Sequence, residues 1–376
     1  MTCVPSRRVR VVAVDMSELR EVVERMTGSS AVGTWACDEL HDPVASATVG
    51  IWRIHADQWS VVVKLLSLGN EGHPHWRAGE EPGHWYYWRR EVLAYESPLL
   101  SSFAGGLRAP GCHLVAERSD GSVALWIEDL KTACAATDWP VARFGQSARH
   151  LGRAQGEFAV GRSLPEEPWL SRRWLRAYLA QRDTDMPLLR DAAAWSTPLA
   201  RRWLPEGWAL PLLDMRGDQE SFVTALERTP QTVCHFDLHP ANLFARGDET
   251  ILVDWSFVGI GAIGEDAGNL VPDSVLDFHV RPEHIDDLYE VVYQGYLAGL
   301  RDSGWTGSAE VLDLAMRATI AAKYAWIAPA MLRAALDRDS ALNRRPIEEA
   351  FTWWAPVIPF LVRCAGEARR LIGAPT

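Results

Sequence analysis

The chain has 376 residues, of which 48% are hydrophobic, and a formal net charge of −11. This length suits two lobes at about 150 residues per domain, and the hydrophobic content is ample for sizeable cores. The acidic balance argues against a general nucleic-acid binder, which normally carries a basic face, so we expect no nucleic-acid partner.

The N-terminal part of the chain predicts a sheet. Strands are expected at 33–40 and 51–55, and the small residues of 45–50 join them. A third strand follows in the apolar run 61–66, which is rich in β-branched residues.

Lys64 lies inside the third of these strands. Only three of the 38 basic residues are lysines, and the other two are Lys131 and Lys323. A chain that carries nearly all of its positive charge on arginine, yet places a lysine in a strand, indicates a use for the point charge. The alternative is a lysine whose ammonium reaches solvent from an edge strand.

A helix and a further strand follow. The sequence is compatible with a helix over 84–96, which Pro98 should end. Its carboxylates include Glu91 and Glu96, which are either partners for the strand lysine or ordinary solvated side chains. The run 122–127 has the composition of another strand.

The segment 235–242, His-Phe-Asp-Leu-His-Pro-Ala-Asn, carries the strongest chemical signal in the chain. Asp237 and Asn242 stand five residues apart, and Asp254 follows twelve residues after Asn242. An Asp and an Asn at this spacing, with a second Asp beyond, supply a base and two metal ligands for phosphoryl transfer.

Two short apolar runs, 242–245 and 250–253, flank Arg-Gly-Asp-Glu and predict a β-hairpin. Gly247 suits a turn position with positive φ. The hairpin would return Asp254 to the neighbourhood of Asn242. The oxygens of both could then face Mg2+, a hard ion that prefers such ligands.

The run 259–264, Gly-Ile-Gly-Ala-Ile-Gly, matches the glycine pattern of dinucleotide-binding sites. That fingerprint requires a helix immediately after it, a βαβ unit and an acidic residue about 20 residues further on. No clear second strand follows before the helical region, so we interpret this run as a flexible segment after the metal-binding Asp. An oxidoreductase that uses a nicotinamide or flavin is the alternative.

The second part of the chain is expected to be helical apart from the hairpin. Prolines should kink or interrupt two of the helices, at Pro329 and at Pro356 and Pro359. Strands followed by helices indicate an α+β fold. The predicted helices span 141–160, 169–181, 283–300, 309–336 and 347–372.

The loop 235–242, with Asp254-Trp255 after it, resembles the aminoglycoside phosphotransferase and choline kinase-like branch of the protein-kinase fold. Those proteins carry a His-Gly-Asp-Leu-His-x-x-Asn-like loop followed by an Asp-Trp or Asp-Phe pair. Phe236 and Ala241 stand where glycine is frequent in that family, and neither difference removes a reacting group.

The resemblance implies a bilobal protein-kinase-like α+β fold. An antiparallel sheet lobe with one main helix, at 1–127, would bind the nucleotide. A larger, mostly helical lobe, at 128–376, would hold the catalytic and substrate-binding residues.

For the second lobe, the resemblance implies a role for each matching residue. Asp237 would orient or deprotonate the substrate hydroxyl. Asn242 and Asp254 would hold Mg2+. His235 would brace the catalytic loop, and so would Asp266.

In the first lobe, Lys64 would contact the α- and β-phosphates of the nucleotide, with Glu91 as its partner because the family carries a Glu at this place. Ser46 and Thr48 could donate to the phosphates, or they belong to an ordinary hairpin loop. Backbone groups would bind the adenine edge at Trp126, Ile127 and Glu128.

These features together predict an ATP- or GTP-dependent, Mg2+-dependent O-phosphotransferase that moves the γ-phosphoryl group to a hydroxyl of a small molecule. An aminoglycoside or another antibiotic is the leading acceptor. A kinase of choline, homoserine or a sugar, and a catalytically silent nucleotide-binding protein, are the alternatives. Asp273 and Asp277 either bind an amino group or are helix-capping or surface acids, so we assign them no role.

The six cysteines include no Cys-x2-Cys pair, so the sequence predicts neither a zinc site nor a disulfide framework. The N-terminus lacks the apolar core of a signal peptide. No uncharged apolar run reaches about 18 residues, the length that a membrane span needs. We therefore expect a cytoplasmic protein without a membrane partner. We expect it to be a monomer or a homodimer.

Overall fold

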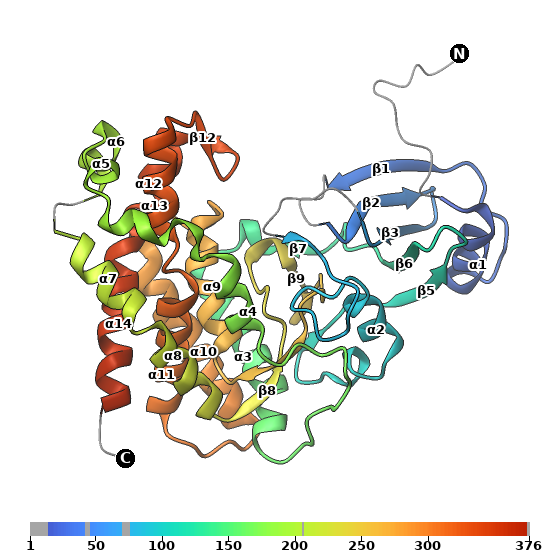
Figure 1. Cartoon of the computed structure of the whole chain (residues 1–376). Helices are drawn as coiled ribbons and strands as arrows, with labels where there is room; N and C mark the ends of the chain where they lie inside the picture. Colours follow the sequence, from blue (N-terminus) through green and yellow to red (C-terminus); the bar gives the residue numbers. More distant parts are fainter. Residues whose placement is uncertain (1–13, 42–45, 70–75, 205–206, 374–376) are drawn as a thin grey trace. The chain divides into compact units, whose positions relative to one another are not determined.

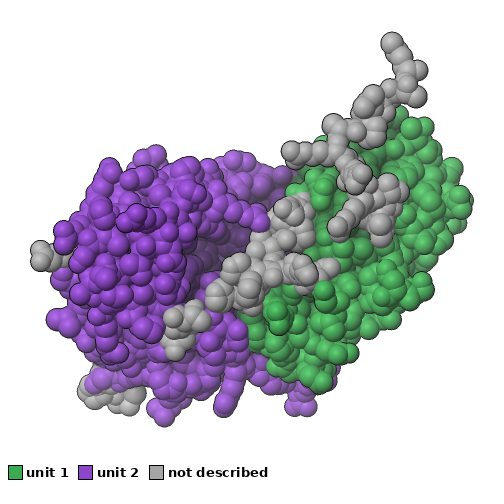
Figure 2. All heavy atoms as spheres, turned by 45° about the horizontal axis from the view of Figure 1, so that its top comes forward, with its two compact units in different colours: residues 1–101, 109–132 green, residues 102–108, 133–376 purple. Residues whose placement is uncertain are grey.

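The computed structural model describes residues 14–41, 46–69, 76–204 and 207–373. The chain forms two compact units, coloured in Figure 2: unit 1 contains residues 1–101 and 109–132, and unit 2 contains 102–108 and 133–376. The sequence predicted one boundary, between 127 and 128. The chain instead crosses between the units three times, because the short strand β4 (Leu107–Arg108) pairs with β10 (Glu249–Leu252) of unit 2.

Unit 1 contains an antiparallel sheet of five strands in the order β1-β2-β3-β6-β5 (Figure 1). The run that predicted the third strand forms β3, and β2 and β6 pair with it on either side. Lys64 therefore stands in an interior strand, which excludes the edge-strand interpretation. The strands are β1 (Ala36–His41), β2 (Thr48–His55), β3 (Ser60–Leu66), β5 (Cys112–Glu117) and β6 (Val123–Glu128).

The helix predicted over 84–96 is shorter in the structure, where α2 spans Arg90–Glu96. The guanidinium of Arg90 explains the late start. It donates to the carbonyl oxygens of His84 and Trp85 at 2.6 and 2.8 Å. These two carbonyls therefore have a partner outside a helical turn, and the preceding residues need not continue the helix.

A helix that the sequence analysis did not predict, α1 (Met16–Thr27), packs on the sheet of unit 1. Asp15 caps its N-terminus by accepting hydrogen bonds from the main-chain N–H groups of Ser17 and Glu18 at 2.7 and 3.3 Å. Gly28 follows its C-terminus in the left-handed conformation. An Asp cap and a terminal glycine are readable helix signals, so the sequence did contain the information.

Unit 2 is mostly helical, as predicted. Two predicted long helices are each divided, 309–336 into α11 and α12 and 347–372 into α13 and α14. None of the helices in the described ranges is long and apolar enough to cross a membrane. The helices are α3 (Val141–Ala159), α4 (Trp174–Gln181), α5 (Ala192–Trp195), α6 (Pro198–Trp203), α7 (Ala209–Gly217), α8 (Gln219–Arg228), α9 (Glu265–Leu276), α10 (Ile285–Asp302), α11 (Ala309–Lys323), α12 (Ile327–Asp337), α13 (Ile347–Trp354) and α14 (Val357–Gly373).

The three prolines expected to kink or interrupt these helices lie where a helix tolerates proline. Pro329 is in the first turn of α12, Pro356 is in the break between α13 and α14, and Pro359 is in the first turn of α14. The N–H groups of a first turn have no partner within the helix, so a missing one costs no helical hydrogen bond.

Small sheets in unit 2 carry the candidate catalytic segment. The predicted hairpin is confirmed: β9 (Leu243–Arg246) and β10 pair antiparallel, and Gly247 has a φ of 57° in the turn. β7 (Cys134–Ala135) and β4 complete this sheet. Before the loop, β8 (Gln231–Cys234) pairs antiparallel with β11 (Gly259–Ala262).

The run 259–264 is not the flexible segment that we predicted, because it forms β11 and leads directly into the buried helix α9. The antiparallel pairing of β11 with β8 also does not fit the parallel βαβ unit of a dinucleotide site. Packing explains two of the glycines. A Cβ on Gly259 would lie 2.1 Å from the main-chain oxygen of Ser171, and one on Gly261 would lie 2.7 Å from the ring of Phe236.

We predict that Gly259→Ala lowers the free energy of unfolding by about 1–3 kcal/mol, because the added methyl group meets rigid backbone. Gly366→Ala is the matched control. It lies in α14 with open space around its Cβ, and the change should stabilise the helix by about 0.5–1 kcal/mol. Chemical denaturation of both variants measures the difference, and equal stability of the two would contradict the packing argument.

Candidate active site

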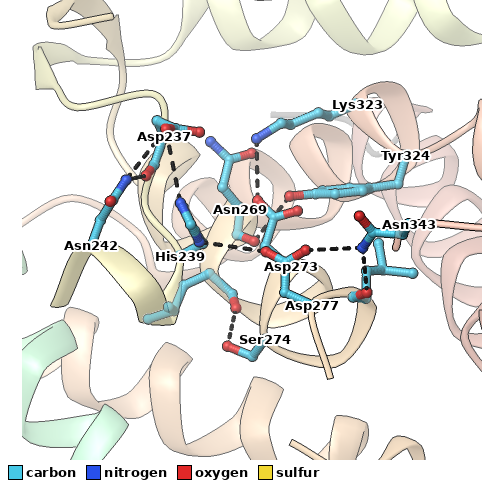
Figure 3. Close-up of polar contacts among 12 residues, drawn as sticks. Asp237, His239, Asn242, Asn269, Asp273, Ser274, Asp277, Lys323, Tyr324 and Asn343 are labelled. Atoms are coloured by element: carbon cyan, nitrogen blue, oxygen red, sulfur yellow. Dashed lines mark hydrogen bonds and ion pairs between the residues drawn. The ribbon is translucent and has the colours of Figure 1, made fainter. Parts of the chain in front are cut away.

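The segment between β8 and β9 carries the Asp237 carboxylate, which Figure 3 draws beside Asn242 and His239. The side chain of Asp237 is 30% exposed. The Nδ2 group of Asn242 donates to the Asp237 main-chain oxygen at 2.9 Å and to its Oδ2 at 3.3 Å. A carboxylate held in this way can orient a hydroxyl or accept its proton once the hydroxyl lies within hydrogen-bonding distance.

The hairpin returns Asp254 towards Asn242, because the Val253 N–H donates to the Asn242 main-chain oxygen at 3.0 Å. Asp254 has a φ of 62°, a left-handed conformation that costs a residue with a side chain about 1–2 kcal/mol. Ser256 Oγ donates to Asp254 Oδ1 at 2.5 Å. Carboxylate and amide oxygens suit Mg2+, which takes water and phosphate oxygens as its other ligands.

No three His, Cys, Asp or Glu side chains of the described ranges gather into a metal site of their own. Asn242 and Asp254 offer one amide and one carboxylate group. Such a sparse set fits a metal that arrives together with phosphate oxygens better than a metal held by protein ligands alone.

His235 is buried beneath the loop in one tautomer. Its Nδ1 accepts from the Asp237 N–H at 3.2 Å, and its Nε2 donates to the Val253 main-chain oxygen at 3.0 Å. Burial lowers the pKa of His235, which favours the neutral ring that these two bonds require. The ring also meets the edge of Trp255 at 4.8 Å between centroids. His235 thus connects the loop to the end of the hairpin.

Asp266, in the first turn of α9, is fully buried and accepts three hydrogen bonds. Its Oδ2 accepts from the His235 N–H and from Gln155 Nε2, and its Oδ1 accepts from the Phe236 N–H, all at 2.7 Å. Burial raises the pKa of Asp266, while the donors act in the opposite direction by stabilising the carboxylate. Two of these donors are backbone groups of the catalytic loop, so Asp266 fixes its path.

Phe236 adopts a φ of 67°, the conformation for which glycine is suited. Its ring is buried and stacks on Trp174 at 5.3 Å with an interplanar angle of 7°. Burial and stacking of the ring offset the backbone cost of about 1–2 kcal/mol. Phe236, which stands where the family often has glycine, therefore adopts the backbone conformation suited to glycine, and its ring adds a packing contact with Trp174.

In unit 1, Lys64 forms an ion pair with Glu91, with 2.6 Å between Nζ and Oε2. The two side chains are only 4% and 2% exposed. Glu96, the other candidate, is exposed. Removing one partner of a buried pair leaves a charge without compensation, which typically costs about 3–5 kcal/mol.

The structure argues against the roles predicted for Ser46 and Thr48. The Ser46 hydroxyl donates its one proton to the main-chain oxygen of Trp76 at 2.9 Å and accepts from the Ala78 N–H at 2.6 Å. Thr48 is the first residue of β2, a buried strand position rather than a loop. The proton of the Ser46 hydroxyl is therefore already donated, and Thr48 does not lie in a loop.

The segment predicted to bind adenine lies in β6, between β3 and β5. Trp126 is fully buried, and its Nε1 donates to Glu18 Oε2 at 2.9 Å. Ile127 is buried in the same strand. The Glu128 N–H donates to the Gly111 main-chain oxygen at 2.8 Å, which removes it from the donors that an adenine could use.

A cluster of charged side chains that the sequence analysis left without a role lies beside Asp237 (Figure 3). His239 Nδ1 is 3.4 Å from Asp277 Oδ2, and its Nε2 is 3.9 Å from Asp237 Oδ2. Burial alone would lower the pKa of His239, but Asp277 and Asp237 raise it to about 9. Lys323 Nζ lies 3.4 Å from Asp273 Oδ2. This side of the loop therefore carries alternating charges.

A sequence signal for part of this cluster existed. Asn269, Asp273 and Asp277 are spaced by four residues, which places side chains on one face of a helix. The spacing is informative only if a helix is predicted at these residues. The glycine-rich run before α9 led us to predict a flexible segment instead.

A sheet-containing unit, a mostly helical unit and a loop with Asp, Asn and a following Asp define a phosphotransferase of the protein-kinase-like fold. Residues 99–309 match the family model described as the APH phosphotransferase enzyme family. The match covers more than half of the chain, so the chain belongs to this family. Asp237, Asn242 and Asp254 lie inside the matched range.

Solved structures share this fold at low sequence identity. The amicoumacin kinase hAmiN, in complex with AMP-PNP, Ca2+ and Ami, is 12% identical with a TM-score of 0.54, covering 89% of this chain and 88% of its own. Spectinomycin phosphotransferase APH(9)-Ia, with ADP and spectinomycin, is 12% identical with a TM-score of 0.52, covering 95% and 100%. A choline/ethanolamine kinase family protein from Mesorhizobium loti is 13% identical with a TM-score of 0.50, covering 95% and 100%. Comparison with curated protein sequences gave no match.

Glu265 neighbours Asp266 in α9 and is also buried. Its Oε2 accepts from the Ala262 N–H at 3.1 Å, but burial dominates and raises its pKa from 4.5 to about 8. The folded protein therefore holds a proton that the unfolded chain releases at lower pH. The resulting stability is fully present below about pH 4.5 and is lost as the pH rises through about 8.

We predict that Glu265→Gln removes this dependence. The free energy of unfolding of the wild type, relative to that of the variant, should fall by up to about 1.4 kcal/mol per pH unit between pH 5 and 8. Urea denaturation over that pH range measures the slope. Glu166→Gln, an exposed position, serves as the control, and it should leave the slope unchanged. A wild type that keeps the same slope as Glu265→Gln would disprove the prediction.

Proposed function

We propose that this protein is a Mg2+-dependent O-phosphotransferase that moves the γ-phosphoryl group of ATP or GTP to a hydroxyl of a small molecule. The observation that carries the proposal is the Asp237 carboxylate, which is partly exposed yet held by Asn242 on a loop that Asp266 fixes. Family membership supports the reaction class.

Positioning and charge neutralisation do most of the work in such a transfer. Asp237 would accept a hydrogen bond from the acceptor hydroxyl and take its proton as the new phosphate ester forms. Mg2+, when bound, neutralises phosphate charge, and Asn242 and Asp254 would hold it. Lys64, oriented by Glu91, would add a positive charge at the nucleotide phosphates.

An antibiotic is the leading acceptor in this proposal. The amicoumacin kinase structure contains AMP-PNP, Ca2+ and Ami, and the spectinomycin phosphotransferase structure contains ADP and spectinomycin. These complexes support both the nucleotide and the acceptor class. The choline/ethanolamine kinase family protein keeps a metabolite kinase as the alternative. We further propose that the protein acts in the cytoplasm, where ATP is available, as a monomer or homodimer.

Release of ADP and GDP across a panel of aminoglycosides, other antibiotics, choline, homoserine and sugars tests the proposal.

We predict that Asp237→Ala lowers kcat by about a hundredfold to ten-thousandfold, because it removes the group that receives the proton. The control is Asp248→Ala, at an exposed position in the hairpin turn, which should keep the wild-type rate. Asp237→Ala with most of the wild-type activity would refute the assignment of the base. Silence of the wild type across the panel, with ATP still bound, would favour a nucleotide-binding protein without catalysis.

The metal assignment has its own test. Calorimetric titration of AMP-PNP into the wild type should give tighter binding with Mg2+ than without it, because Asn242 and Asp254 add ligands to the metal. Asp254→Ala should bind AMP-PNP about equally in both conditions. An undiminished Mg2+ effect in Asp254→Ala would show that the metal is held elsewhere.

A further inference from the structure

Asn269 has a buried side chain whose polar atoms lack partners. It lies on α9 and is fully buried, yet neither Nδ2 nor Oδ1 has a hydrogen-bond partner among the described residues. Figure 3 shows its amide directed towards Lys323 and the Asp237 carboxylate. Burial of an amide without hydrogen bonds is unfavourable, so this position indicates a group that Asn269 binds.

Lys323, the last residue of α11, is drawn beside this amide in Figure 3, and its side chain is 6% exposed. Its ammonium carries three N–H donors. Within the described ranges its one hydrogen bond is a long contact of 3.4 Å to Asp273 Oδ2. The nitrogen also lies 5.4, 5.8 and 5.3 Å from the ring centroids of Trp174, Tyr178 and Tyr324. Lys323 therefore retains donor capacity beside the candidate base.

These groups define the chemistry of a ligand. Lys323 and the Asn269 Nδ2 supply donors, while the Asn269 Oδ1 and the Asp273 carboxylate accept. A ring with several hydroxyl groups matches this set, because each hydroxyl both donates and accepts. A cationic group does not match it, since the position over the three aromatic faces is already taken by the ammonium of Lys323.

We propose that Asn269 and Lys323 form an acceptor subsite beside Asp237 that recognises the oxygen atoms of a polyhydroxylated ring and excludes a quaternary ammonium group. The ring would be a sugar or a cyclitol, either free or as part of a larger acceptor. Amino groups elsewhere on the acceptor remain compatible with the subsite. The part of this inference that concerns the transferred phosphoryl group rests on the proposed function, whereas ring binding does not.

Saturation-transfer NMR on the full chain tests the subsite without requiring turnover. The probes are myo-inositol, D-glucose, 2-deoxystreptamine and choline, each at millimolar concentration. We expect saturation transfer to myo-inositol and D-glucose, weaker transfer to 2-deoxystreptamine because of its two ammonium groups, and none to choline. Choline binding as strong as polyol binding, or no binding of either polyol, would overturn the proposal.

Two variants locate the binding. Asn269→Leu and Lys323→Met should each weaken myo-inositol binding about tenfold, because each removes hydrogen bonds to the ring. Lys131→Met, which removes an exposed lysine of unit 1, is the control and should bind like the wild type. Unchanged binding in both subsite variants would overturn the proposal.

Thermal unfolding separates a binding role for Asn269 from a structural one. Leucine has a similar volume and no polar atoms, so Asn269→Leu should keep or raise the Tm while binding is lost. A lower Tm would assign Asn269 to the folded structure instead and would overturn the proposal. This variant also serves if Lys323→Met does not fold.

The outcomes separate this inference from the proposed function. Polyol binding that depends on Asn269, without ADP release above the Asp237→Ala blank, would leave the subsite standing and remove the kinase activity. Phosphoryl transfer to an acceptor that has no hydroxylated ring would support the kinase activity and overturn the proposed subsite.

Discussion

The buried carboxylate of Asp266 is the constraint on which the candidate site depends. It satisfies two consecutive backbone N–H groups of the catalytic loop, those of His235 and Phe236, and a third donor from Gln155 on α3. Tyr296 extends the network from α10, because its hydroxyl donates to Gln155 Oε1 at 2.5 Å. A change in the loop would leave a buried charge without its partners, so the loop is held by the helical core itself.

The path of the loop then decides what its side chains can do. With its first two N–H groups fixed, the loop turns at Phe236 in a left-handed conformation, and the ring of Phe236 is secured against Trp174. The next residue, Asp237, is directed to the surface and receives the amide of Asn242. The buried carboxylate of Asp266 thus positions the partly exposed carboxylate of Asp237, which carries the proposed chemistry.

The features that could be predicted from the sequence are local. The hairpin of β9 and β10 depends on a few adjacent residues and a turn glycine, and the structure contains it as predicted. The Lys64–Glu91 pair could be anticipated as well. The composition of the chain singled out Lys64, and the family resemblance indicated Glu91 as its partner. The helix α9 could not be anticipated. Its glycine-rich approach resembles a loop. Only the structure shows why Gly264 and Gly268 stand there: both pack against α11, and Gly264 has a φ of 83°.

The cluster around Lys323 shows the same limit. Fifty residues separate Lys323 from Asp273, and their pairing follows from the packing of α11 on α9 rather than from any spacing in the sequence. Ser46 is the opposite case. The small residues around Ser46 suited a loop that covers phosphates. The Ser46 hydroxyl is instead hydrogen-bonded to Trp76 and Ala78, some thirty residues further along the chain. Contacts between segments that are distant in the sequence therefore explain both the cluster around Lys323, which was not predicted, and the position of Ser46, which does not suit its predicted phosphate role.

The most direct test of phosphoryl transfer is 31P NMR of the full chain with ATP, Mg2+ and each acceptor of the panel. A new phosphate-monoester resonance that grows as the γ-phosphate signal of ATP declines, and that requires both the acceptor and Mg2+, is the predicted result. Growth of inorganic phosphate alone with every acceptor, or an unchanged ATP spectrum, would contradict the account.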